Sequence, residues 1–313
     1  MKCIFSILDI KAGYSIMNLE LYKAFYQIAR AGSISRASEQ LYISQPAVSR
    51  AIRQLEHELG CPLFFRTSKG VKLTQQGQIL YQHIDQAFSF IAAGEKRVAE
   101  VQNLSSGEIR IGASDTLCKY YLIPYLKLFH TYYPAIKIHV TCLSTPGIIK
   151  LLKAGKADFG IINMPLYDDQ LAYKDIMEIQ DCFIAGEKYR HLSHKVQSIG
   201  ELVKYPLLLL EKSSNTRIYM DRYFKRHSLA VDPAFELGNI DLLIQFARYD
   251  FGIACVIRNF IEEELAEGSF FEIRLAEKIP PRNISAVWLK DVPLSAAARE
   301  LIGYLDRPET SDI

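Results

Sequence analysis

Hydrophobic residues near the N-terminus recur at the spacing of an α-helix in three short segments. The first segment ends at Gly32, and its apolar side chains lie three or four positions apart or side by side: Leu19, Tyr22, Phe25, Tyr26 and Ala29. A second short helix is expected over 33–42, with Ala37 and Leu41 on its inner face. Because Ala37 is small, a third helix can cross it closely. The pattern therefore predicts a compact helical module.

The third helix is predicted to run from Ser44 to Gly60 and to have two different faces. Ser44 can cap its first turn, and Pro46 lies where a missing backbone N–H costs nothing. Its apolar stripe has spacings of four, three and four residues: Val48, Ile52, Leu55 and Leu59. The opposite face carries an amide, a hydroxyl and two guanidinium groups: Gln45, Ser49, Arg50 and Arg53. Such groups read base edges and phosphates in a DNA major groove; the alternative is an ordinary solvated surface.

A basic hairpin is expected directly after the third helix. The segment "RTSKGVKLT" has the pattern of two strands that turn at Lys69 and Gly70, and its cations are Arg66, Lys69 and Lys72. Beside a recognition helix, such a hairpin would form a wing against the phosphate backbone. The helices and the hairpin together predict a winged helix-turn-helix over 17–73.

A long helix is expected next, because the chain has no proline from Thr74 to Leu104 and apolar or small residues recur at alternating spacings of four and three. A narrow stripe sustained for four heptads is typical of a coiled-coil seam, and it predicts a linker and dimerisation helix over 74–104. Gly77 and Gly94 would allow close approach. The residues expected at the dimer interface are Leu80, Ile84, Ala87, Ile91 and Val98. The alternative, a helix packed on its own body, favours a wider apolar stripe.

Strand-like and helix-like segments alternate over the remaining two-thirds of the chain. "EIRIGAS", "IKIHVTCLS" and "ADFGIINM" are expected strands separated by helices, and a second set runs from "CFIAGE" to "GIACVI". This alternation favours a parallel sheet in an α/β domain over 107–313. We expect a first subdomain of 107–180 and 279–306 and a second of 181–278. Two such halves would enclose a cleft and could close on a hinge.

The net charge of +2 is unevenly distributed. The segment from Met17 to Leu80 contains eight Lys or Arg and four Asp or Glu, and the rest of the chain is slightly acidic. A basic module on such a body indicates a polyanion-binding head. The six cysteines form no CxxC pair, so we expect a reducing cytoplasm. No segment approaches the ~18 apolar residues of a membrane span. Residues 1–16 show neither helical periodicity nor a cleavage site, and we expect them to be dispensable.

The segment from "ISRASEQLY" to "LTQQG" resembles the winged helix-turn-helix of LysR-type transcriptional regulators. The third helix, an "LG.PLF.R" element and an "LT..G" exit occur in the family's order, although Ser38 stands where the family usually has alanine. The resemblance implies a homodimer or homotetramer bound to double-stranded DNA, and contact with RNA polymerase is compatible with it. The residues that it places at the DNA surface are Ser44, Gln45, Pro46, Ser49, Arg50 and Arg53.

The C-terminal region is similar, more loosely, to the family's effector domain. "LLKAGKADFGII" and "ARYDFGIACV" carry this similarity, which implies a two-subdomain fold like that of periplasmic binding proteins and a small-molecule effector in the cleft. The implied binding residues are Ser114, Asp115, Thr116, Ser144, Thr145, Ser213, Ser214, Asn215, Thr216 and Asn239. Several precede helix starts, where backbone N–H groups can hold an anion, and Arg217 lies in one first turn. We therefore expect an anionic effector, with a carboxylate as the favoured class. The alternative is that the hydroxyls only cap helices and that Arg217 pairs with a surface acid.

Motifs of other chemistry are missing from the sequence. There is no GxGxxG after a strand, no P-loop and no HExxH, so we expect no cofactor, no metal and no catalytic residue. His191 and His194 lack a nearby third ligand. Cys118 and Cys142 flank the expected cleft, but such cysteines are more often small core residues than oxidant sensors. The favoured interpretation is a ligand-responsive DNA-binding regulator. The alternative is a cytoplasmic solute-binding or enzymatic α/β protein whose N-terminal helices mediate oligomerisation.

Overall fold

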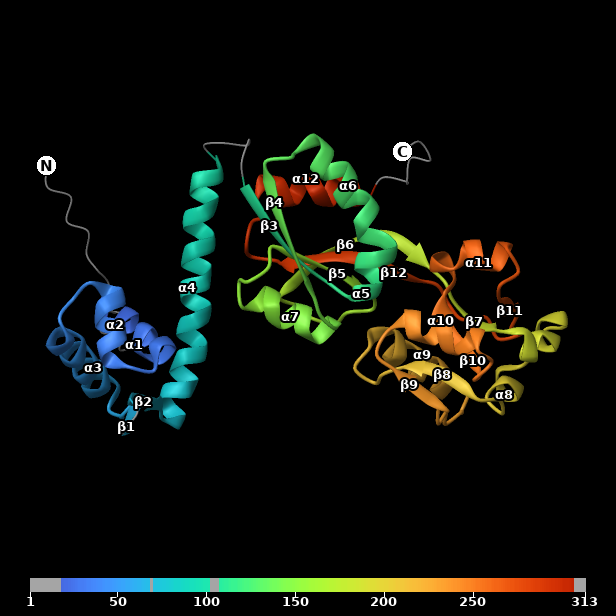
Figure 1. Ribbon diagram of the computed structural model, residues 1–313, viewed down its shortest axis with the longest axis horizontal. Helices are drawn as coiled ribbons and strands as arrows, with labels where there is room; N and C mark the ends of the chain where they lie inside the picture. The colour runs from blue at the N-terminus through green and yellow to red at the C-terminus, as the bar shows by residue number, and fades with distance from the viewer. Residues whose placement is uncertain (1–17, 68–69, 102–106, 307–313) are drawn as a thin grey trace, which may run out of the picture. The chain divides into compact units, whose positions relative to one another are not determined.

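The computed structural model describes residues 18–67, 70–101 and 107–306, which form two units divided after Ile91 (Figure 1). The expected extension 1–16 lies outside the described residues. The first unit has the winged helix-turn-helix fold that the sequence predicts. Its elements are α1 (Leu19–Ala31), α2 (Ile34–Leu41), α3 (Gln45–Leu59), β1 (Phe64–Thr67), β2 (Gly70–Leu73) and the start of α4 (Gln75–Val101).

Two helices of the first unit, α1 and α3, end where the sequence provides glycine. Gly32 and Gly60 follow α1 and α3 with φ of 64° and 68°, a left-handed conformation that glycine adopts without strain. The start of α3 differs from expectation. Ser44 is at the N-cap position, but its side chain makes no capping hydrogen bond. The expectation that the Ser44 hydroxyl caps this helix was therefore wrong.

Two polar side chains and a glycine join α3, the hairpin and α4. The carboxylate of Glu56 accepts a hydrogen bond from the backbone N–H of Leu63 at 2.7 Å. The hydroxyl of Thr74 donates to the carbonyl of Pro62 at 2.8 Å and accepts from the N–H of Gly77 at 2.9 Å. A Cβ on Gly77 would lie only 2.1 Å from the carbonyl oxygen of Leu63, so this close approach requires glycine.

The stripe expected on α4 divides into two parts. Gly77 and Leu80 lie against the core of their own unit, where Leu80 is half-buried. Farther along, Ile91 and Val98 are 42% and 68% exposed, and Ala87 is also exposed. The apolar stripe is thus covered at its start and open later.

The second unit contains two five-stranded sheets. The first has the order β4 (Ile136–Cys142), β3 (Gly107–Ala113), β5 (Phe159–Asn163), β12 (Arg282–Leu289) and β6 (Leu171–Ile179). The second has the order β9 (Phe235–Leu237), β8 (Leu207–Leu210), β10 (Ile253–Ile257), β7 (Asp181–Ala185) and β11 (Phe271–Ile273). In each sheet three strands run parallel, and a strand that enters from the other half runs antiparallel to them. The strands expected from the alternation, β3, β4 and β5, thus run parallel as predicted, and the strands that cross from the other half make both sheets mixed.

Helices cover both faces of each sheet (Figure 1). On the first sheet, α6 (Ile123–Tyr132) and α12 (Ala296–Leu305) lie on one face and α7 (Thr145–Lys153) on the other. On the second, α10 (Ile240–Arg248) lies on one face and α9 (Asn215–Arg226) with α8 (Ile199–Leu202) on the other. The shorter elements are α5 (Asp115–Leu117), a π-helical turn (Cys118–Leu122), α11 (Glu262–Ala266) and two 3₁₀ turns (Glu187–His194 and Arg258–Phe260).

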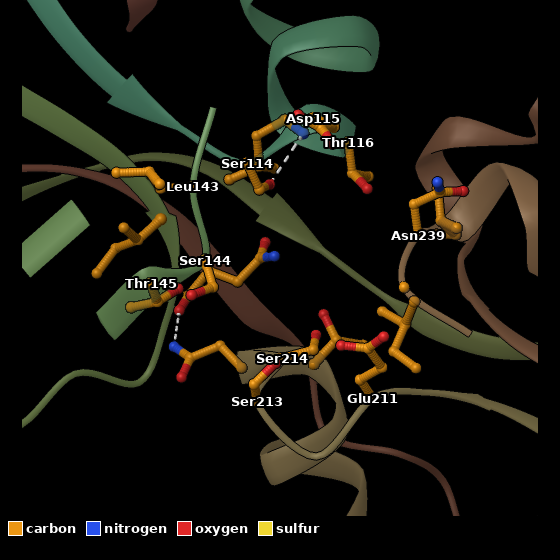
Figure 2. Close-up of a pocket in the computed structure, with 18 of the residues that line it drawn as sticks. Ser114, Asp115, Thr116, Leu143, Ser144, Thr145, Glu211, Ser213, Ser214 and Asn239 are labelled. Carbon is orange, nitrogen blue, oxygen red and sulfur yellow. Dashed lines mark hydrogen bonds between the residues drawn. The ribbon is translucent and has the colours of Figure 1, made fainter. Parts of the chain in front are cut away.

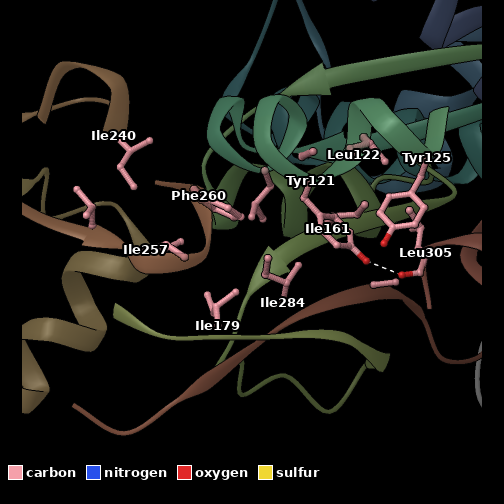
Figure 3. Packing of buried hydrophobic residues seen from close by; sticks show 14 of the residues in the cluster. Tyr121, Leu122, Tyr125, Ile161, Ile179, Ile240, Ile257, Phe260, Ile284 and Leu305 are labelled. Carbon is pink, nitrogen blue, oxygen red and sulfur yellow. Dashed lines mark hydrogen bonds between the residues drawn. The ribbon is translucent and has the colours of Figure 1, made fainter. Parts of the chain in front are cut away.

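One hydrophobic cluster runs through both halves of the second unit. Figure 3 shows Tyr121 and Ile161 of the first half packed in the same cluster as Ile257 of the second. The rings of Tyr120 and Phe260 stack with centroids 5.1 Å apart. Because the halves share buried apolar surface, this cluster holds them together in addition to the strands that connect them.

A buried ion pair joins the two connecting strands. Asp181 begins β7 and Arg282 begins β12, and their side chains are 0% and 3% exposed. Arg282 donates to both carboxylate oxygens of Asp181, from Nε at 2.6 Å and from Nη2 at 2.8 Å. Nη2 also donates to the hydroxyl of Thr216 in α9 at 2.9 Å. Beside this pair, Nε2 of Gln180 donates to the carbonyl of Ile279 at 2.9 Å.

We predict that Asp181→Asn lowers the free energy of unfolding by about 3–5 kcal/mol, because it leaves the charge of Arg282 buried without its carboxylate. Chemical denaturation of the full chain measures this loss. The control is Asp306→Asn, which breaks an ion pair with Lys174 of 2.7 Å whose side chains are 48% and 42% exposed. An exposed pair contributes below about 1 kcal/mol. Equal losses in the two variants would show that the connecting strands do not depend on the buried pair.

Candidate functional site

The outer face of α3 forms a polar, basic surface. Side chains with the expected DNA-reading chemistry are exposed there, apart from a half-buried Ser49: Ser44, Gln45, Pro46, Arg50 and Arg53. Nε of Arg53 donates to the carbonyl of Ser49 at 3.2 Å, which orients this guanidinium along the helix. Three residues of the opposite stripe, Val48, Ile52 and Leu55, are buried, whereas Leu59 in the last turn is 41% exposed. The helix thus presents the predicted residues outward because its apolar stripe faces the core.

Of the three cations expected on the hairpin, Lys72 is the one whose side chain the structure describes. Lys72 is exposed on β2, which pairs antiparallel with β1. Lys69 lies outside the described residues, and so does the side chain of Arg66. Sequence reasoning did not single out Tyr42, which lies in the turn between α2 and α3 with φ of 54° and is 94% exposed. The feature of the sequence that could have identified it is an aromatic residue in the turn between the two expected helices.

A cavity of about 380 Å³ opens in the second unit where parallel strands of both sheets end (Figure 2). The residues after β3 and β4 form its wall on one half, and those after β8 and β9 form it on the other. The carboxyl ends of strands are where open α/β sheets bind ligands. Ten of the residues expected in the cleft line the cavity: Ser114, Asp115, Thr116, Ser144, Thr145, Ser213, Ser214, Asn215, Thr216 and Asn239.

Arg217 does not line the cavity, so its expected role in effector binding was wrong. Its side chain is 3% exposed and turns back from the first turn of α9. The guanidinium donates to Asp221 at 2.8 Å, to the carbonyl of Leu210 at 2.9 Å and to Glu236 at 3.3 Å. These partners occupy the guanidinium inside its own half. These contacts agree with the alternative in which Arg217 pairs with an acidic residue.

The residues at helix starts around the cavity differ in how they use their side chains. Ser114 and Asn239 are capping residues, since each accepts a hydrogen bond from the backbone N–H three positions later, at 3.2 and 2.9 Å. Ser144 and Ser214 occupy the N-cap positions of α7 and α9 without a capping bond. Within the described chain, neither of these two hydroxyls has a hydrogen-bond partner. Their hydroxyls and the first backbone N–H groups of α7 and α9 are therefore available to a ligand.

The charged residues among the described lining are both acids, Asp115 and Glu211. Glu211 follows β8, and a Cβ on Gly238 would lie 3.3 Å from its Oε1. Sequence reasoning missed Glu211 and also Asn163, which ends β5. The Oδ1 atom of Asn163 is buried and has no hydrogen-bond partner in the described structure. Each of the two residues ends or follows an apolar strand, and this position was the signal that could have identified them.

Cys142 lies in the cavity wall near Cys118. Burial, together with a hydrogen bond to Asp115, raises the pKa of the Cys142 thiol to about 11. The thiol is therefore protonated at neutral pH, whereas reactive cysteines have a lowered pKa. This environment disfavours a role for Cys142 as an oxidant sensor.

A polar contact bridges the two halves beside the cavity. Nζ of Lys119 and the hydroxyl of Tyr120 both donate to Asp241 in the first turn of α10, at 2.7 and 2.6 Å. Burial opposes ionisation of Asp241, but the hydrogen bonds from Lys119 and Tyr120 hold its pKa below the usual value. The carboxylate is thus charged at neutral pH and links the π-helical turn of one half to a helix of the other.

The described ranges also bear on two other features, a metal site and a membrane-spanning helix. No group of three or more His, Cys, Asp or Glu in the described ranges is arranged to hold a metal ion. The helices of the same ranges include none that is long and apolar enough to cross a bilayer.

Two family models match almost the whole chain. Residues 19–78 match the model described as bacterial regulatory helix-turn-helix protein, lysR family. Residues 102–308 match the model described as LysR substrate binding domain. The first match covers the helix-turn-helix and its wing, and the second covers both sheets and the cavity.

Individual proteins are similar over the same length. The transcriptional regulator YeiE of Escherichia coli K12 is 27% identical over 293 residues, which cover 93% of this chain and 97% of YeiE. The crystal structure of HinK, a LysR family regulator from Pseudomonas aeruginosa, has 25% identity and a TM-score of 0.58, with 92% and 97% of the two chains covered. Full-length CbnR in complex with its target DNA has 17% identity and a TM-score of 0.61, with 92% and 99% covered, and shows likeness of fold alone.

Proposed function

Because the chain belongs to the LysR family of transcriptional regulators, we propose that it reads operator DNA with the outer face of α3 and that a small anionic effector in the cavity controls DNA binding or activation. Family membership makes the chain a DNA-binding transcriptional regulator with an effector-binding domain, and not an enzyme. The finer parts of the proposal concern which residues bind DNA, which surface forms the dimer and what the effector is.

The DNA-reading surface is proposed from the chemistry of α3. Arg50 and Arg53 are exposed on one side of a helix whose other side is buried in the core. Guanidinium groups pair with guanine in the major groove, while lysines such as Lys72 neutralise phosphates. The structure of CbnR with its target DNA, which shares this fold, supports placing such a unit on DNA.

We predict that Arg53→Ala lowers discrimination between operator and random DNA by ~1–3 kcal/mol, because it removes a base-reading group. Lys72→Ala should weaken binding to both DNAs equally and reduce the salt dependence by about one unit of slope. Titrations of the full chain against both DNAs over a range of salt concentrations measure these effects. If the two variants changed discrimination equally, the assignment of reading to α3 and of anchoring to the wing would fail.

The dimer is proposed to form along the open part of α4. LysR regulators form oligomers, and here Ala87, Ile91 and Val98 leave an apolar stripe exposed while Ile84 is half-buried. Exposed apolar residues at coiled-coil spacing are typical of a helix that pairs with a second copy. A homodimer is the minimum assembly, and a homotetramer of paired dimers extends it.

We predict that Ile91→Asp dissociates the dimer, because facing carboxylates in an apolar seam would be buried without partners at a cost of several kcal/mol. Sedimentation of the full chain measures the association. Ile79→Asp is the matched control, since Ile79 is 54% exposed on the same helix but off the stripe. A dimer that survived Ile91→Asp as well as Ile79→Asp would place the interface elsewhere.

A carboxylate effector is proposed from the two uncapped helix starts. The N-termini of α7 and α9 reach the cavity from opposite halves, and the hydroxyls of Ser144 and Ser214 are unused within the described structure. Backbone N–H groups and hydroxyls at helix starts bind anions such as carboxylates. We also propose that the protein acts in the cytoplasm. The five cysteines in the described ranges are unpaired, which is typical of a reducing compartment. Contact with RNA polymerase stays a prediction of the family resemblance.

We predict that a metabolite screen by thermal shift on the full chain identifies carboxylates as stabilising ligands. Ser214→Ala should weaken the best of them about tenfold, or 1.4 kcal/mol, without loss of stability, because this hydroxyl makes no capping bond. Asn239→Ala is the control that removes a real cap, and it should lower the free energy of unfolding by about 1 kcal/mol. Stabilisation by neutral or cationic compounds alone would refute the carboxylate, though not the regulator.

A further inference from the structure

We infer that the effector carries a protonated amine as well as a carboxylate, so that its class is a free amino acid or close analogue, and that Glu211 binds the amine. This inference rests on the proposed carboxylate site and adds the second half of the ligand.

The described cavity wall contains two carboxylates and no side-chain cation, since Arg217 is turned away. A ligand with only negative charge would find partial positive charge at the helix starts, and it would also face Asp115 and Glu211 without compensation. A charge juxtaposed with a like charge is disfavoured in a binding site. A ligand with both charges avoids this conflict, because its carboxylate can lie at the helix starts and its amine at an acid.

Glu211 is the acid best placed for the amine. Asp115 already accepts a hydrogen bond from the Cys142 thiol. The carboxylate of Glu211 makes no ion pair or hydrogen bond with the described residues. The neighbouring Gly238 adds no side chain to cover it, since even a Cβ there would lie 3.3 Å from Oε1. This carboxylate is therefore open to the cavity and unpaired.

Glu211 and the anion site lie on the same turn of the chain. The backbone N–H of Ser214 donates to the carbonyl of Glu211 at 2.9 Å, and the N–H of Glu211 donates to Leu237 at 3.1 Å. Figure 2 shows Glu211 and Ser214 side by side on one wall, with Ser144 and Thr145 on another. The acid and the helix start are thus fixed next to each other. A ligand whose amine and carboxylate are on one carbon atom carries the two matching charges close together.

A further acceptor in the wall lacks a donor. Oδ1 of Asn163 is buried without a hydrogen-bond partner in the described structure, while the Asn215 amide donates to the carbonyl of the same residue. An ammonium group provides three donors, whereas a carboxylate provides none. An unsatisfied acceptor in the same cavity as an unpaired carboxylate therefore favours a ligand that brings N–H groups.

The test uses calorimetry and thermal shift on the full chain with three sets of compounds. These are the proteinogenic L-amino acids, the carboxylates obtained from each by removing the amine, and the amines obtained by removing the carboxylate. We expect an amino acid to bind at least about tenfold more tightly than either of its two truncated analogues, a difference of 1.4 kcal/mol. Glu211→Gln should remove this tenfold preference over the carboxylate analogue and leave the affinity for that analogue unchanged or higher. Glu211→Asp, which keeps the charge, should retain part of the preference.

The matched control is Glu263→Gln, the same change at an exposed acid outside the cavity, and it should leave every affinity unchanged. Carboxylates that bind as tightly as their amino acids, with no effect of Glu211→Gln, would overturn the amine and leave the carboxylate proposal standing. Amines that bind best would overturn both. Failure of every amino acid to bind would also overturn the inference.

Discussion

The second unit depends on the buried ion pair between Asp181 and Arg282. Each residue begins a strand that carries the chain from one half into the other, so the pair fixes both connections at one point. Neither charge can be buried alone without a large cost, which makes the pairing nearly obligatory. Arg282 also bonds to Thr216, which lines the cavity.

The cavity contrasts with this rigid connection. It is built from the ends of strands, the starts of helices and short polar side chains, and both halves contribute to it. A ligand that contacts α7 and α9 together favours the arrangement of halves in which both are within reach, which is how a small molecule shifts a conformational equilibrium. The contact of Lys119 and Tyr120 with Asp241 bridges the same two halves without a ligand. Under the proposed function, the effector would therefore change how firmly two halves that already touch are held together.

The sequence predicted features that depend on local pattern. The helices of the first unit followed from apolar spacing and from Gly32 and Gly60, and the cavity residues followed from polar side chains after apolar strands. Features set by distant neighbours were not predictable. Arg217 turns away because Glu236 and the carbonyl of Leu210 bind its guanidinium from neighbouring strands. Leu80 is half-buried because α4 packs against the core, where Gly77 allows the close approach. The edge strand β6 was missed because charged residues such as Lys174 and Asp175 interrupt its apolar pattern. The chain crosses between the two halves twice, and the strands that begin after these crossings, β7 and β12, run antiparallel to their neighbours. No local pattern in the sequence reveals these crossings.

The central claim is that the effector is held between the two halves at the ends of their parallel strands. A crystal structure of the full chain with its tightest-binding metabolite tests this claim most directly. The account predicts that the ligand lies in the cavity with its carboxylate within about 3.2 Å of backbone N–H groups at the start of α7 or α9, and that it contacts residues of both halves. A ligand bound outside the cavity, or contacting one half alone, would contradict the account.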